Sequence, residues 1–152
     1  FNAWFDLGRT SMMLNDYRTA AMAFQKVIEI DPEFSDAYLQ IALMLDEQGK
    51  MEKAIEYYRK ALEHNPQNVG IYTNLSMIYF KQGDFQKAIA INKDALKTIP
   101  NAYDPLVNIG KTFYNMEQMD SALVYFEKAY RVNPNDQNLV NMIQGLRQGK
   151  SN

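Results

Sequence analysis

The chain has 152 residues, with 16 Lys and Arg against 18 Asp and Glu and a formal net charge of −2. This balance provides no basic face for neutralising phosphates, and no apolar run approaches the roughly 18 residues of a membrane helix, so we expect neither nucleic-acid binding nor membrane insertion. The absence of cysteine excludes disulfides and thiolate chemistry.

Two residue types recur at a constant interval of 34 positions. The prolines of this series are Pro32, Pro66, Pro100 and Pro134, and the alanines are Ala20, Ala54, Ala88 and Ala122. A fixed period of this length is typical of repeat proteins, in which small identical units stack on one another. The chain is in register from Phe1 onward, so we expect it to be a piece of a longer protein.

Each repeat is predicted to hold two helices, the first at roughly residues 2–14 and the second at roughly 17–30 of the first repeat. Large residues three to four positions apart mark one face of each helix. Small residues such as Gly8 and Ala20 fall where two helices would cross closely, and large residues that face small ones let paired helices interdigitate.

Turn and cap residues lie at the ends of these predicted helices. Gly49 and Gly83 mark the tight turn inside the second and third repeats, and Asp16 and Asp84 are suited to cap the helix that follows. The proline column ends each second helix, because proline cannot continue a helix and pushes the preceding residue out of the α region.

The columns resemble the tetratricopeptide repeat, whose pattern is Trp, Leu-Gly and Tyr in the first helix, then Ala, Phe, Ala and a closing Pro. The first repeat carries Trp4, Leu7, Gly8, Ala20, Phe24 and Pro32. The resemblance implies an all-α, right-handed α-solenoid superhelix formed by a single domain over residues 1–152. Its expected parts are repeats 1–34, 35–68, 69–102 and 103–136 and a capping helix 137–149.

Three positions depart from the pattern. Ser11 replaces the first-helix aromatic residue of the first repeat, Glu117 replaces the turn glycine of the fourth, and Asn92 replaces the second-helix aromatic residue of the third. None of them touches the alanine or proline columns, so the expected fold stands. Packing around Asn92 is expected to differ from that in the other repeats.

In the family that the chain resembles, the first helices line a concave groove. The residues that would face it, and that we predict to bind a partner, are Phe5, Arg9, Met12, Leu39, Gln40, Leu43, Asn74, Met77, Phe80, Asn108, Lys111 and Tyr114. The apolar ones, together with Val107, would expose apolar surface, which usually marks an interaction site. The alternative is that some of them pack between adjacent repeats as ordinary core.

The amides of Gln40, Asn74 and Asn108 share one column. An amide donates and accepts hydrogen bonds at once, so such a row could hold the backbone of an extended peptide; alternatively, these residues are polar because exposed helix faces are polar. The carboxylate clamp by which chaperone adaptors of this family hold C-terminal peptides needs Lys, Asn and Arg on three successive first helices. No register of the chain matches more than one of these residues, so we expect no clamp.

Catalytic motifs are absent, and His64, the only histidine, is expected to be structural near a helix C-terminus. We therefore predict no enzyme activity, metal or cofactor. The predicted function is a non-catalytic scaffold that binds a protein or peptide in the groove. The alternatives are a self-assembling module that forms a homo-oligomer through its N-terminal end, and the substrate-docking arm of an enzyme whose catalytic domain lies outside this sequence.

Overall fold

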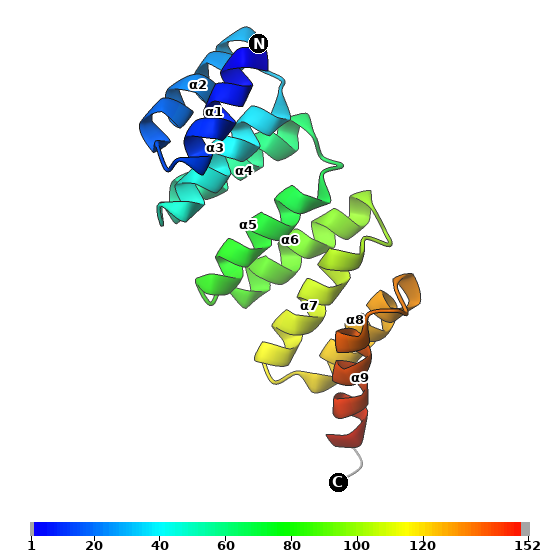
Figure 1. Ribbon diagram of the computed structural model, residues 1–152. Helices are drawn as coiled ribbons and strands as arrows, with labels where there is room; N and C mark the ends of the chain where they lie inside the picture. Colours follow the sequence, from blue (N-terminus) through cyan, green and yellow to red (C-terminus); the bar gives the residue numbers. More distant parts are fainter. Residues whose placement is uncertain (1, 150–152) are drawn as a thin grey trace. The chain divides into compact units, whose positions relative to one another are not determined.

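The computed structural model describes residues 2–149, and all regular secondary structure within this range is helical. The helices are α1 (Asn2–Met13), α2 (Tyr17–Ile30), α3 (Ser35–Glu47), α4 (Met51–His64), α5 (Val69–Lys81), α6 (Phe85–Thr98), α7 (Tyr103–Asn115), α8 (Met119–Val132) and α9 (Gln137–Gly149). Odd- and even-numbered helices alternate as the first and second helices of the repeats (Figure 1), and α9 follows as a single helix. The two predicted helices of the first repeat are thus confirmed to within a residue.

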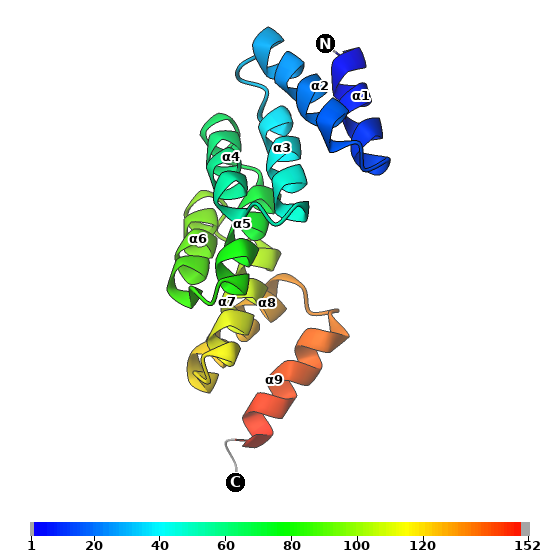
Figure 2. The same ribbon diagram turned by 90° about the vertical axis from the view of Figure 1, so that its left-hand side faces the viewer.

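The chain divides into two compact units, the first ending at Ile71 and the second beginning at Tyr72. In unit 1, α1 packs against α2, α2 against α3, and α3 against α4. In unit 2, α6 packs against α7, α7 against α8, and α8 against α9. Figure 2 shows α1 beside α2 and α3 beside α4.

In the first, second and fourth repeats the hairpin is held by a large ring on the second helix that packs onto a small residue of the first. Phe24 and Phe126 are fully buried, and a Cβ added to Gly8 or Gly110 would lie 2.5 Å from the facing ring. Glycine is therefore required at these two positions by the close approach of the ring. In the second repeat Ala42 stands in the glycine position, and the ring of Tyr58 is fully buried as well.

The turns between paired helices all need one residue with positive φ. Gly49 and Gly83 supply it at φ +71° and +76°, as the sequence predicts, and Asn15 and Glu117 occupy the equivalent positions with φ 58°. Asparagine tolerates this left-handed conformation better than most residues. In Glu117 the same conformation is destabilised by the steric clash of the Cβ atom with the backbone.

Both predicted aspartate caps are confirmed. Asp16 accepts a hydrogen bond from the backbone N–H of Thr19 at 3.1 Å, and Asp84 accepts one from that of Lys87 at 3.2 Å. Hydrogen bonds from the side chains of Thr19 and Lys87, together with these backbone bonds, favour the ionised carboxylates, so the pKa of each carboxyl lies below its usual range.

The last helix is fixed to the fourth repeat by apolar and polar contacts. Leu139 and Ile143 are buried in one cluster with Leu106 and Phe126. Asp136 caps α9 by accepting from the N–H of Leu139 at 3.1 Å and also accepts from the Tyr103 hydroxyl. Burial and this hydrogen bond raise the pKa of Tyr103 to about 12. α9 therefore covers apolar surface of α7 and α8, as a capping helix does.

The equivalent surface of α1 is not covered in this way. Trp4 is 37% exposed and Leu7 39%, whereas Leu106 and Ile109, their counterparts in the fourth repeat, are 4% and 0% exposed. α1 thus presents an apolar edge.

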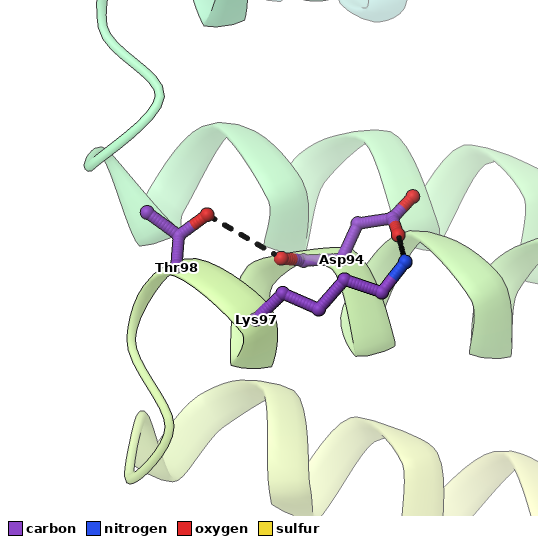
Figure 3. Close-up of polar contacts among 3 residues, drawn as sticks. All are labelled: Asp94, Lys97 and Thr98. Carbon is purple, nitrogen blue, oxygen red and sulfur yellow. Dashed lines mark hydrogen bonds and ion pairs between the residues drawn. The ribbon is translucent and has the colours of Figure 1, made fainter.

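Charged side chains occupy the side of α6 that points away from its buried residues. Lys97 Nζ lies 2.6 Å from Asp94 Oδ1, and Thr98 Oγ1 donates to the Asp94 carbonyl oxygen at 3.5 Å (Figure 3). Lys97 is 77% exposed, so this ion pair adds little to stability. Asn92 lies on the opposite side of α6, which faces the other helices.

Gly110→Ala is expected to lower the free energy of unfolding by about 1–3 kcal/mol, because the added methyl group would overlap the Phe126 ring. Gly145→Ala is the matched control: nothing lies within 4 Å of a Cβ there, and alanine is the better helix former by about 0.5–1 kcal/mol. Urea unfolding measures the free energy of unfolding of both variants. Equal destabilisation by the two would contradict the contact described here.

Glu117→Gly is expected to raise the free energy of unfolding by about 1 kcal/mol, because it removes the steric cost of a side chain at positive φ. Gly83→Ala should lower it by a similar amount, since a Cβ there meets no neighbour and only the backbone conformation is penalised. Thermal and urea unfolding measure both effects. A loss of stability in Glu117→Gly would show that the conformation of this turn is not its main constraint.

Candidate binding site

The residues predicted to bind a partner lie on the odd-numbered helices of both units. On α1, α3, α5 and α7 these residues are spaced by three or four positions and so share one face. We call the face that carries them the first-helix face. None of the twelve predicted residues is fully buried. Each unit's share of them is described separately.

In unit 1 these residues belong to α1 and α3. Arg9 is exposed, whereas Met12, Leu39, Gln40 and Leu43 are half-buried. Phe5 is also half-buried.

The ring of Phe5 stacks edge-on against two other rings, with centroids 5.7 Å from Phe24 and 5.2 Å from Phe34. Edge-to-face contacts of this kind stabilise aromatic clusters. Phe5 is therefore anchored in the repeat packing, with only part of its ring left for a ligand.

In unit 2 the predicted residues belong to α5 and α7. Met77 is 42% exposed and Tyr114 is 47% exposed, and Lys111 is exposed as well. Asn74 and Asn108 are half-buried, and so is Phe80, whose ring contacts that of Phe85 at a centroid distance of 5.4 Å.

Val107 does not lie on an exposed face as expected. It is partly buried and packs against the apolar cluster around Leu106 and Phe126. For this residue the alternative that the sequence left open, packing between adjacent repeats as ordinary core, holds in part.

Four of the predicted residues surround a single cavity of about 60 Å³. Its lining residues are Met77, Phe80, Asn108 and Lys111, together with Ser76, Ala88, Asn92 and Thr112. They belong to α5, α6 and α7 and lie within unit 2. We call this space the Asn92 pocket. Asn74 and Tyr114 do not line it.

The Asn92 pocket occupies the place that a ring fills in other repeats. Asn92 stands in the column of Phe24, Tyr58 and Phe126 and is only 1% exposed. It is shorter than a phenyl ring, and Ser76 replaces the glycine that faces the ring in the first and fourth repeats. The Ser76 hydroxyl donates to the Thr73 carbonyl oxygen at 2.9 Å, so it bonds its own helix and leaves the space unfilled.

Two amide atoms in the walls of the pocket are buried and have no hydrogen-bond partner within the described part of the chain. Asn92 donates from Nδ2 to the Ala88 carbonyl oxygen at 2.9 Å, but its Oδ1 accepts no bond. Asn108 Nδ2 donates none. An unsatisfied buried donor or acceptor costs about 1–3 kcal/mol, so each needs an explanation in terms of solvent, strain or function.

Ser76, Ala88, Asn92 and Thr112 were missed as site residues. Asn92 was recognised from the sequence as a departure from the aromatic column, and its expected consequence was altered packing. The signal that could have identified it as a pocket-lining residue is the joint replacement of both members of the ring and glycine pair, Asn92 for the ring and Ser76 for the glycine.

In the second repeat, which belongs to unit 1, the position equivalent to Asn92 holds a ring. The Tyr58 ring fills its space, but its hydroxyl is buried without a partner in the residues described. Burial, with smaller contributions from the charges of Asp46 and Glu47, raises the pKa of this hydroxyl above its usual range. The hydroxyl therefore stays neutral and adds no charge to the site.

Between residues 2 and 149, no three His, Asp or Glu side chains come together in a way that could hold a metal ion. None of the helices in this range combines the length and the apolar character needed to cross a membrane.

Several solved structures share the fold. A crystal structure of MamA aligns with a TM-score of 0.79 at 22% identity, covering 99% of this chain and 82% of MamA. PilF of Pseudomonas aeruginosa aligns with a TM-score of 0.80 at 24% identity, covering 99% and 68%. YrrB, described as a TPR protein with an unusual peptide-binding site, gives 0.72 at 20% identity, covering 91% and 72%.

Sequence comparison identifies the family. No curated protein sequence matches the chain. Residues 103–136 match a tetratricopeptide repeat model, and residues 1–106 match the model of the cytochrome c-type biogenesis protein H TPR domain. The predicted all-α tetratricopeptide-repeat fold is thereby confirmed, and the chain belongs to the family of tetratricopeptide-repeat domains found in cytochrome c-type biogenesis protein H.

Proposed function

We propose that the chain is a non-catalytic interaction module that binds a peptide segment of a partner protein on its first-helix faces. The observation that supports this most directly is the Asn92 pocket, in which apolar side chains surround a buried amide donor without an acceptor. A few well-placed polar groups within apolar walls are typical of binding sites.

The residues around the pocket suit a peptide. Met77, 42% exposed, provides adaptable apolar surface, and Phe80 forms part of the pocket wall. Asn108 Nδ2 can donate to a carbonyl oxygen of the bound segment, which would satisfy its missing hydrogen bond. The exposed ammonium group of Lys111 favours a segment that carries a negative charge near the pocket.

A binding function without chemistry agrees with the general role of tetratricopeptide-repeat proteins as adaptors. The described residues hold no metal-ligating cluster, and the hydroxyls of Ser76 and Thr112 in the Asn92 pocket donate to backbone carbonyl oxygens of their own helices. The family description directs the search for a partner first to proteins of c-type cytochrome biogenesis.

Self-association is a second candidate, favoured by the exposed apolar edge of α1 at Trp4 and Leu7. If this edge joins two copies, replacing both residues with serine should convert a dimer to a monomer, because the apolar contact is lost. Sedimentation equilibrium over a wide concentration range measures the effect. A wild-type protein that stays monomeric at every concentration would exclude self-association.

Asn108→Ala and Met77→Ala are each expected to weaken partner binding by roughly tenfold while leaving the fold intact, because each removes one contact to the segment. Asn74→Ala should weaken it if the amide column also holds the peptide backbone. The first measurement is capture of partners from lysate of the source cell, identified by mass spectrometry, followed by calorimetry with the purified partner.

Gln86→Ala is the matched control, since Gln86 is exposed on α6 and lies outside the Asn92 pocket. A partner that binds wild type and all three variants equally would place the binding surface elsewhere and refute the proposed site.

A further inference from the structure

We infer that the Asn92 pocket is a specificity pocket for a carboxamide side chain, that of Gln or Asn, on the bound partner segment. This inference rests on the proposed function and names the chemical group that the site selects. Three observations carry it: the shape of the pocket, the pair of unsatisfied amide atoms, and the position of its mouth.

The shape follows from the missing ring. In the first and fourth repeats the space between paired helices is closed by Phe24 and Phe126, whose rings approach glycine to 2.5 Å. In the third repeat Asn92 and Ser76 leave a cavity of about 60 Å³ that is lined on its apolar side by Met77, Phe80 and Ala88. Such a space accepts the slim methylene chain and flat end of an amide side chain.

The unsatisfied atoms determine which polar group fits. Asn92 Oδ1 needs a donor and Asn108 Nδ2 needs an acceptor, and both atoms are buried. A carboxamide supplies an N–H and a C=O from one planar group. A carboxylate has no proton to donate to Asn92 Oδ1, and an ammonium or guanidinium group has no lone pair to accept from Asn108 Nδ2.

The mouth of the pocket opens on the surface that the proposed function uses. Met77 and Lys111, both exposed, border the pocket on α5 and α7. A segment lying on these two helices would therefore have its side chains next to the opening. Asn92, only 1% exposed, forms part of the pocket wall on α6 behind them.

A single ordered water molecule is the main rival occupant, since water also donates and accepts. A hydroxyl side chain is another. Neither uses the apolar wall formed by Met77, Phe80 and Ala88, whereas the methylene groups of a Gln side chain would contact it.

The direct test uses propionamide, which is a Gln side chain without its backbone, and follows the side-chain NH₂ signals of the ¹⁵N-labelled protein. Propionamide should shift the signals of Asn92 and Asn108 in a saturable way and leave that of the exposed Asn135 unaffected. Sodium propionate, of the same size but without a donor, should shift neither. No saturable shift, or equal shifts with propionate or 1-propanol, would overturn the inference.

The matched variant is Ser76→Gly/Asn92→Phe, which restores the glycine and ring pair of the other repeats and fills the pocket. It should unfold cooperatively and bind propionamide at least about tenfold more weakly than wild type. If it does not fold, Asn108→Leu provides the same test, because leucine has a similar size and no donor. Undiminished propionamide binding by a folded variant would overturn the inference.

A displayed library of random peptides separates this inference from the proposed function. Selection on wild type should enrich Gln or Asn at one position, and selection on the filled variant should not. Peptides that bind without such enrichment would refute the carboxamide pocket and leave peptide binding intact. A library that yields no binder at all would refute both.

Discussion

The contact between a buried second-helix ring and a small first-helix residue is the constraint on which the hairpins of the first, second and fourth repeats depend. Gly8 with Phe24 and Gly110 with Phe126 show it most clearly, because the ring occupies the place of the missing Cβ. Such large-to-small packing sets how closely the two helices approach, and the alanine columns extend it along the hairpin. Side chains on the first-helix faces that take no part in this packing remain at the surface.

The third repeat keeps this hairpin without the ring. Asn92 is as well buried as the aromatic residues of its column, yet it bonds only its own helix through Nδ2. In this repeat the apolar packing of a ring is therefore replaced by a cavity with a polar group in its wall. In a protein whose other hairpins are closed, one open position gives an otherwise generic scaffold a place where one kind of side chain is preferred over another.

Much of this fold could be predicted from the sequence, because helix periodicity, caps and turns are local. The aspartate at position 84 and the glycine at 83 each specify a cap or a turn through their own backbone neighbours. The pocket could not be predicted, because it depends on where the Ser76 hydroxyl and the Asn92 amide point after three helices have packed. The partial burial of Val107 could not be predicted for the same reason, because the sequence does not say whether a column of a repeat faces the groove or the next helix.

The paired replacement at Ser76 and Asn92 also limits how this repeat can change. Reintroducing a ring at position 92 alone would place it opposite Ser76, a larger residue than the glycine or alanine that faces the ring in the other repeats. Introducing glycine at position 76 alone would weaken α5 and fill nothing. Each single substitution toward the common pattern is therefore expected to be unfavourable, whereas the double substitution restores the glycine and ring pair. Closing the opening in this repeat in the manner of the other repeats therefore requires two coordinated substitutions.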